Sequence, residues 1–252
     1  INGVDTKMVT PEEVKEIVPI ININGPRFPV LGALWQPRGG TARHDAVAWG
    51  YARKCSDYGI DIIEQCEVIG VKKKRDKIVG VETTKGNIKA KKVCFVAAGH
   101  SSVLADLAGF RLPIESVALQ ALVSEPIKPI IDCVVMANTV HGYLSQSDKG
   151  ELVIGGGADG YNNYSQRGSF LHIEETVRAL VETFPVISRL RQLRQWGGIV
   201  DMTGDRSPII SKTPVDGLYI NCGWGTGGFK AIPGSGWATA EMIYNEKPGK
   251  LA

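Results

Sequence analysis

The sequence lacks the cysteine pattern of a disulfide-rich secreted protein. Its 252 residues contain five cysteines, an odd number, and no two of them are spaced as C-x-x-C. Disulfide frameworks and cysteine zinc sites need paired or closely spaced cysteines. The four histidines also lack metal-binding spacing. We therefore expect reduced thiols, no metal site and a cytoplasmic location.

Long apolar runs and a strong charge of one sign are missing too. No apolar run reaches the roughly 18–20 residues that a membrane-spanning helix needs, and the net charge is only +3. The basic run Lys72–Arg75 is followed by Asp76, which favours a solvated hairpin turn. Neither a membrane nor a nucleic acid is expected as a partner. Since the first residue is not Met, we expect a processed, truncated or partial polypeptide.

The sequence does have the ordinary apolar content of a globular protein, 43%, with helical and strand patterns interleaved. Residues 19–41 are rich in Gly, Pro and Asn and are expected to form a loop. Apolar spacing predicts helices over 11–17, 45–58, 101–107, 173–184 and 234–244. It predicts strands over 60–63, 67–71, 77–83, 86–90, 93–97, 117–124, 134–137, 142–145, 151–155, 189–203 and 218–222.

The strongest motif is the strand 218–222, which runs into Gly223–Gly228 and then a helix. Glycines let the backbone approach a ligand closely, and a helix N-terminus offers free N–H groups. A tight turn is the structural alternative. Lys230, just after the loop, is either a solvated lysine or a cation that faces a carboxylate or a flavin.

Two weaker motifs also precede helices. Val96–Gly99 ends a strand with small residues, which suits either a ligand crevice or ordinary packing. Gly39–Asp45 enters a helix that Asp45 is expected to cap. His44 directly precedes Asp45. A lone loop histidine is most often a surface residue, although it can act as a base or a cofactor attachment point.

Other chemistry is poorly supported by the sequence. No G-x-G-x-x-G loop follows a first strand, so the first βαβ unit of a dinucleotide fold is not expected here. Gly155–Gly157 follows a strand, but no helix is predicted after it. Asp201 and Asp205 resemble a carboxylate pair, yet Gly204 and Pro208 favour a turn.

Together, these segments resemble the D-amino-acid-oxidase-like family of FAD-dependent amine oxidoreductases. Within that family, they look most like the β subunits of heterotetrameric sarcosine oxidases. The resemblance rests on residues 39–50, 66–70, 96–102, 196–198, 203–208 and 223–230, which follow the family's order.

The resemblance implies a fold of the α/β class, with mixed α+β character. It consists of an incomplete FAD-binding Rossmann-like domain and a substrate domain with a mixed, largely antiparallel sheet. The substrate domain is expected to cover residues 1–40 and 111–200, and the FAD domain residues 41–110 and 201–252.

The resemblance also implies roles for individual residues. Lys230 is expected to bind the substrate carboxylate and to promote reaction with oxygen, and Tyr143 to lie near the active site. His44 is expected to carry covalent FMN at the interface with the α subunit. The FAD-binding residues would be Val68, Ala98, Gly99, Gly225, Thr226, Gly227, Gly228, Phe229 and Lys230.

The sequence departs from the family pattern in several places. Residues 199–208 contain no cysteine, so FAD is expected to be non-covalent, unlike in monomeric relatives. Gly155–Asp159 offers no catalytic histidine where those relatives have one. The phosphate loop and the carboxylate-binding arginine of the family are missing, so we expect this polypeptide alone to bind FAD poorly.

The expected reaction is oxidation of sarcosine to glycine, with formaldehyde and H2O2, beside α, γ and δ-type subunits. One alternative is a subunit of an L-proline or dimethylglycine dehydrogenase. The other is an inactive fragment that acts only as a subunit-docking scaffold.

Overall fold

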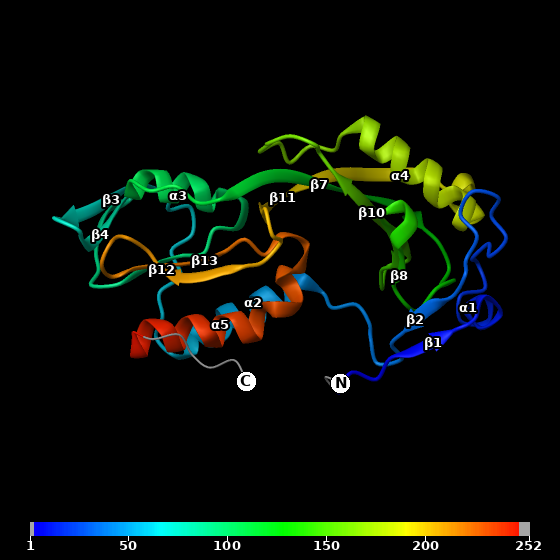
Figure 1. Ribbon diagram of the computed structural model, residues 1–252, viewed down its shortest axis with the longest axis horizontal. Coiled ribbons are helices and arrows are strands. Elements are labelled where there is room, and N and C mark those ends of the chain that lie inside the picture. The colour runs from blue at the N-terminus through cyan, green and yellow to red at the C-terminus, as the bar shows by residue number, and fades with distance from the viewer. Residues whose placement is uncertain (1–2, 247–252) are drawn as a thin grey trace. The chain divides into compact units, whose positions relative to one another are not determined.

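The computed structural model describes residues 3–246, which form two compact units (Figure 1). The sheet unit comprises residues 3–54, Leu119–Asp159 and Ser165–Gly198. The loop unit comprises Cys55–Ala118, Gly160–Tyr164 and residues 199–246. Each unit has its own cluster of buried apolar side chains.

A five-stranded sheet is the framework of the sheet unit. Its strand order is β11-β7-β10-β9-β8, and β10 pairs antiparallel with both β7 and β9. The predicted, largely antiparallel sheet is therefore confirmed. The strands are β7 (Ile114–Pro126), β8 (Val135–Ala137), β9 (Gly142–Gln146), β10 (Glu151–Ala158) and β11 (Gln192–Thr203).

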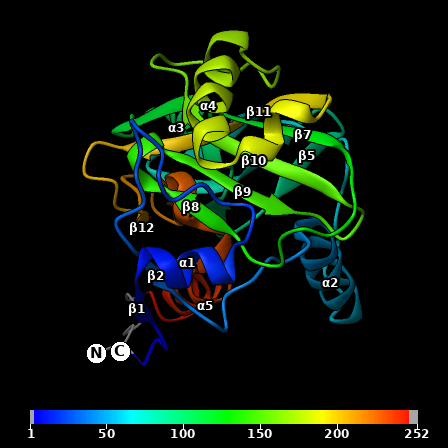
Figure 2. The ribbon, with the colours of Figure 1, turned by 90° about the vertical axis from the view of Figure 1, so that its right-hand side faces the viewer.

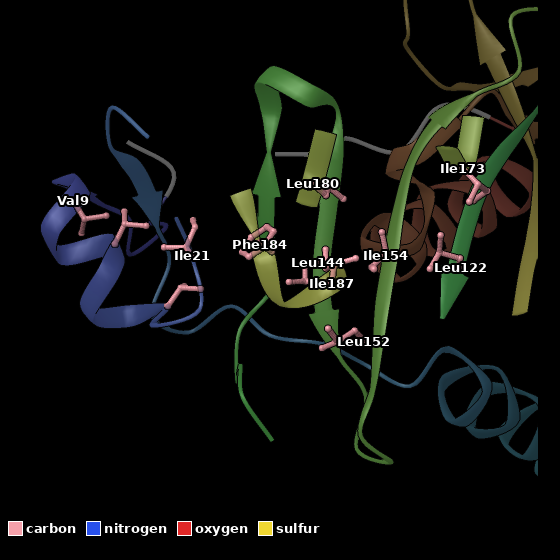
Figure 3. Close-up of a cluster of buried hydrophobic side chains, with 12 residues drawn as sticks. Val9, Ile21, Leu122, Leu144, Leu152, Ile154, Ile173, Leu180, Phe184 and Ile187 are labelled. Carbon is pink, nitrogen blue, oxygen red and sulfur yellow. The ribbon is translucent and has the colours of Figure 1, made fainter. Parts of the chain in front are cut away.

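One helix, α4 (Phe170–Thr183), lies against β9 and β10 of this sheet (Figure 2). Its apolar positions recur at helical spacing, as the sequence predicts, and Leu180 is fully buried. Leu180 belongs to one core with Leu144, Ile154 and Phe184 (Figure 3). Truncating such a residue to alanine costs about 2–5 kcal/mol, so this core fixes the sheet and its helix together.

The N-terminal part of the sheet unit contains a small antiparallel pair, β1 (Lys7–Val9) and β2 (Ala33–Trp35). Between them, α1 (Pro11–Ile17) occupies the predicted helix and begins with a capping box between Thr10 and Glu13. The prediction of a loop over 19–41 is wrong at β2. Three residues with a distant partner leave no periodic signal, because the strand exists only through its pairing with β1.

The loop unit contains two three-stranded sheets. The strands predicted over 67–71, 77–83 and 86–90 are confirmed and form a three-stranded antiparallel meander, in which the basic run ends β3 and enters the turn to β4. In the second sheet, of order β12-β13-β6, strand β13 is parallel to β6, as the continuous apolar run of β6 indicates, and it is antiparallel to β12, a strand that was not predicted. The bounds are β3 (Val68–Lys74), β4 (Lys77–Thr83), β5 (Gly86–Lys89), β6 (Val93–Phe95), β12 (Ile209–Lys212) and β13 (Leu218–Cys222).

Three helices begin earlier than predicted, and one of them is α4, which starts at Phe170 and not at the expected Ile173. α5 (Gly228–Asn245) starts six residues before the expected Gly234 and contains Pro233 in its second turn, where proline cannot donate the helical hydrogen bond. α2 (His44–Asp57) starts at His44, so the expected cap Asp45 lies inside its first turn. The remaining helix, α3 (Ser101–Ala108), confirms the prediction. Short 3-10 helices are η1 (Ala98–His100), η2 (Asn138–Val140), η3 (Pro185–Arg189) and η4 (Gly225–Gly227).

The predicted strand over residues 60–63 is wrong. The segment is irregular in the structure, and Ile60, Ile62 and Ile63 are each more than half exposed. An apolar extended segment becomes a strand only when a neighbour takes up its backbone hydrogen bonds. No described strand pairs with it. Within residues 3–246, no helix is long and apolar enough to cross a membrane.

Candidate active site

In the loop unit, two loops begin at the carboxyl ends of a parallel pair of strands, β6 and β13. β6 and β13 lie in register, with Leu218 opposite Val93 and Ile220 opposite Phe95. β6 leads to η1 and α3, whereas β13 leads to η4 and α5. The carboxyl ends of neighbouring parallel strands are where open α/β sheets bind ligands. The structure therefore brings the predicted Ala98–Gly99 and Gly225–Lys230 segments to the same edge.

The loop after β13, residues 223–227, is held from behind by Asp201 on β11. The side chain of Asp201 is almost fully buried, with 2% of the residue exposed. Its Oδ2 accepts a hydrogen bond from the Gly223 N–H at 2.5 Å, and its Oδ1 accepts one from the Gly225 N–H at 3.2 Å. One carboxylate thus fixes two backbone amides of the loop.

Glycine is required at both of these positions. Gly223 and Gly225 have φ of +75° and +50°, in the left-handed region. A Cβ on Gly223 would lie 2.8 Å from Thr203 Cγ2, and one on Gly225 would lie 2.8 Å from Met202 Sδ. The last residues of β11, Asp201, Met202 and Thr203, therefore pack along one side of the loop.

The other side of the loop is open. Thr226, Phe229 and Lys230 are exposed, and no side chain caps the start of α5 at Gly227. The first N–H groups of a helix lack partners within the helix and carry partial positive charge. The Lys230 Nζ adds a full charge, 3.9 Å from the position of a Cβ on Gly227. This surface can accept an anion or an electron-rich ring.

The loop after β6 is shaped mainly by packing. Gly99 is buried, and a Cβ there would lie 2.2 Å from Ile199 Cγ2. Its carbonyl accepts a hydrogen bond from Ser116 Oγ at 2.6 Å. Ala98 is exposed and has a positive φ of 44°, a costly conformation for a residue with a Cβ. Ala98 is therefore the more accessible of the two residues.

Val68, Tyr143 and His44 lie away from these loops in the chain. Val68 begins β3, half-buried opposite Thr83. Tyr143 lies on β9, where burial raises the pKa of its hydroxyl. A Cβ on the facing Gly155 would lie 2.4 Å from the Tyr143 ring. The roles assigned to these three residues stay predictions.

His44 is the first residue of α2 and is exposed. Beside it, Arg43 Nη2 lies 2.7 Å from Asp45 Oδ2. This hydrogen bond is the main reason that the pKa of Asp45 is lowered to about 2. Asp45 therefore pairs with Arg43 where the sequence suggests a helix cap, and the His44 ring remains accessible.

The sequence reasoning missed Asp201. It grouped Asp201 with Asp205 as residues of a turn, and the structure separates the two. Asp205 does lie in the turn, where its Oδ1 accepts the Ser207 N–H at 3.0 Å. Asp201 lies inside the strand before the turn. An acidic residue among the apolar residues of a strand was the available signal, since such a group is buried only with partners.

A second polar cluster, also missed, lies in the sheet unit. Gln120 Nε2 donates to Asp159 Oδ1 at 3.2 Å, and the Ser169 N–H donates to Gln120 Oε1 at 2.8 Å. His172 Nε2 lies 3.4 Å from the same Asp159 oxygen. These contacts join the start of α4 to β7 and to the end of β10, so the cluster explains how the helix docks.

Comparison with known proteins assigns the chain to a family. The model of the family described as FAD dependent oxidoreductase matches residues 1–242. The chain therefore belongs to the FAD dependent oxidoreductase family.

Several relatives are similar over nearly the whole chain. Sarcosine oxidase subunit beta of Rhodobacter capsulatus is 72% identical, over 96% of this chain and 59% of that protein. The subunit of the same name from Rhizobium meliloti is 50% identical, over 100% and 61%. The chain thus spans about three fifths of the length of these relatives. Among solved structures, L-proline dehydrogenase from P. horikoshii matches with a TM-score of 0.91 and 32% identity, over 99% of this chain and 67% of that one.

Proposed function

We propose that this chain is part of the flavin-binding β subunit of a sarcosine oxidase. The proposed reaction converts sarcosine, O2 and water into glycine, formaldehyde and H2O2. The identity of 72% to a sarcosine oxidase β subunit supports the substrate. The observation that carries the chemistry is the pair of loops at the ends of β6 and β13, with an uncapped helix start and Lys230.

The residues at this edge fit a flavin nucleotide. Residues 225–229 form the loop and the start of α5, with Thr226 and Phe229 exposed on the open side, and Ala98 is exposed on the neighbouring loop. With Gly99 and Val68, they are the proposed contacts of FAD, which is held without a covalent bond. Bound FAD supplies the two-electron acceptor for amine oxidation. We assign residues 41–110 and 201–252 to the FAD domain, and residues 1–40 and 111–200 to the substrate domain.

Lys230 is the proposed catalytic cation. Its ammonium group binds the carboxylate of the amino-acid substrate and stabilises negative charge that develops during oxidation and oxygen reduction. Tyr143 is the proposed neighbour of the substrate. Burial raises its pKa, so its hydroxyl stays protonated at neutral pH and can donate a hydrogen bond.

His44 is the proposed attachment point of FMN. Its exposure at the start of α2 leaves the imidazole accessible to a second cofactor at a subunit interface. The proposed partners are α, γ and δ-type subunits, and the proposed location is the cytoplasm. In the His44→Ala variant, acid-precipitated protein should contain no flavin. Covalent flavin retained by that variant would exclude this attachment site.

A second candidate is a subunit of an L-proline dehydrogenase. The similarity to the P. horikoshii enzyme favours it, because 32% identity accompanies a TM-score of 0.91. A dimethylglycine dehydrogenase subunit remains a third reading of the same flavin chemistry. An inactive docking scaffold is the alternative outside catalysis.

The test uses the whole subunit, coexpressed with its partner subunits. Our proposal predicts a yellow protein with flavin absorbance, and sarcosine turnover coupled to H2O2 formation. L-Proline or dimethylglycine as the preferred substrate, with no H2O2, would favour a dehydrogenase. A colourless complex that turns over none of the three amines would favour the scaffold.

A further inference from the structure

We infer that Asp201 is a positioning residue that shapes the glycine loop for the flavin. The inference rests on the proposed function, because it assigns the loop to flavin binding. It concerns a residue that contacts the loop rather than the substrate. The evidence is the geometry of Asp201, the conformation of the loop and the contrast with Asp205.

The loop conformation is one that binds anions. Gly223 is left-handed, Trp224 is right-handed with φ −78° and ψ −15°, and Gly225 is left-handed again. Such an alternation turns successive N–H groups toward one point, which makes an anion-binding concavity. Here the anion is the carboxylate of Asp201, which accepts the N–H groups of Gly223 and Gly225.

Because the Gly223 and Gly225 amides already donate to the Asp201 carboxylate, they are not available to a cofactor. The N–H groups that follow, at the start of α5, therefore meet the ligand together with Lys230. A second set of contacts fixes the same loop. Trp224 Nε1 donates to Asn221 Oδ1 at 2.5 Å, and Asn221 Nδ2 donates to Thr239 Oγ1 at 2.8 Å. Asp201 and Asn221 thus hold the loop at its start while its outer side stays open.

The cost of burial argues that Asp201 has a specific task. A buried carboxylate is expensive unless hydrogen bonds compensate for its lost hydration. Asp201 is 2% exposed, and the two loop amides supply hydrogen bonds to both of its oxygens. An asparagine would avoid that cost, but it would put an NH2 group, which cannot accept, in place of one of the two oxygens that the amides contact.

The variants Asp201→Asn and Asp201→Ala test the inference, with Asp205→Asn as the matched control. Asparagine keeps the size of the side chain, but its amide nitrogen cannot accept from a glycine N–H. We expect the FAD dissociation constant of the whole enzyme to rise at least tenfold in Asp201→Asn, and further in Asp201→Ala. The visible flavin spectrum should shift in both variants, and Asp205→Asn should stay within twofold of wild type. A purely structural role for Asp201 would lower the melting temperature but leave FAD affinity and the spectrum unchanged.

Hydrogen–deuterium exchange on the wild-type enzyme keeps the inference testable if the Asp201 variants do not fold. Without FAD, the Gly223 and Gly225 amides should already be protected. The Gly227 amide, which donates to the Trp224 carbonyl at 2.9 Å, should be protected in both states. The amides of Thr226, Phe229 and Lys230 should gain protection only when FAD is added. Fast exchange at Gly223 and Gly225 until FAD is added would overturn the inference, because those amides would then bind the cofactor.

The two proposals fail in different ways. A wild-type complex that binds no FAD would refute the proposed function, and exchange at Gly223 and Gly225 would still decide whether Asp201 holds the loop. If the wild-type complex binds FAD, and Asp201→Asn and Asp201→Ala bind it with the same affinity, only the role of Asp201 is refuted.

Discussion

One glycine run in this chain follows a strand and another lies inside a strand, and the two have glycine for largely different reasons. Gly223–Gly228 leaves a parallel strand and enters α5, with its amides held by a buried carboxylate. Gly155–Gly157 lies inside β10, between two antiparallel neighbours. In the first run, glycine lets the backbone take left-handed conformations and remain open on one side. In the second, Gly155 and Gly156 make room for the neighbouring residues 141–143, and Gly157, with φ of +71°, is left-handed.

The close contacts of the second run show this directly. A Cβ on Gly155 would lie 2.4 Å from the Tyr143 ring, and a Cβ on Gly156 would lie 2.4 Å from the His141 carbonyl oxygen. No helix starts directly after them, since β10 continues to Ala158 and α4 begins only at Phe170. A glycine run therefore indicates a ligand site only when its neighbours leave the backbone accessible.

The largest expected effect is on the cation at the end of the first run. Lys230→Met should lower kcat/KM for sarcosine by roughly 10²–10³-fold, the loss typical when one electrostatic stabiliser is removed. Lys230→Arg keeps the charge and should recover part of the activity. Steady-state kinetics of the whole enzyme measure both. Equal kcat/KM values for wild type and Lys230→Met would remove Lys230 from the catalytic machinery.

Alanine at Gly155 and at Gly223 should separate the two runs. Gly155→Ala should lower the free energy of unfolding by about 1–3 kcal/mol through overpacking against Tyr143, with FAD affinity unchanged. Gly223→Ala should lower both, because a left-handed alanine costs roughly 1–2 kcal/mol and distorts the loop. Denaturant unfolding and FAD titration make the two measurements. The same loss of FAD affinity in both variants would contradict the claim that only the Gly223–Gly228 run takes part in FAD binding.

A smaller effect concerns Cys222, which immediately precedes Gly223. Burial, with a contribution from the Asp201 charge, raises the pKa of its thiol to about 11, from an ordinary value of 9. Burial raises the pKa of Cys94 to about 11 as well. At pH 8, only about one thiol in a thousand is then ionised at each site.

We therefore expect iodoacetamide to modify Cys94 and Cys222 last among the five cysteines, as read by mass spectrometry of peptides. A raised folded pKa means that the stability from keeping these thiols neutral is present below pH 9. It is lost as the pH rises from 9 to 11. Rapid alkylation of Cys222 at pH 8 would show that the base of the loop is open to solvent.

The smallest expected effect is at Gly234, inside α5. A Cβ there meets no atom within 4 Å, and its φ is not positive. Gly234→Ala should raise stability by about 0.5–1 kcal/mol through helix propensity, with FAD binding unchanged. It is the matched control for Gly223→Ala. A clear loss of stability would mean that another surface packs on this face of α5.

Local patterns explain why much of the fold is predictable from the sequence. The alternation in β9 and β10 and the spacing in α4 each reflect one buried face, so the sequence carries them directly. The continuous apolar run at Val93–Phe95 likewise indicates a parallel strand, and β13 supplies its partner. The predictions that failed concern segments whose structure depends on a distant partner. β2 exists only through its pairing with β1, and residues 60–63 have no described strand to pair with.

The candidate site follows the same division. Its glycine loop and Lys230 were found because glycine and a helix start have local signatures. Asp201 was missed because its role depends on a contact 22 residues away along the chain. Whether an acidic residue in a strand is buried against a loop is a property of the folded chain rather than of the neighbouring sequence.

A structure of the whole subunit with bound FAD tests the central claim most directly. Our account predicts that the isoalloxazine ring lies against Gly225–Phe229, with Lys230 beside it and Asp201 still bonded to Gly223 and Gly225. A flavin bound at another edge, with the loop in open solvent, would contradict it.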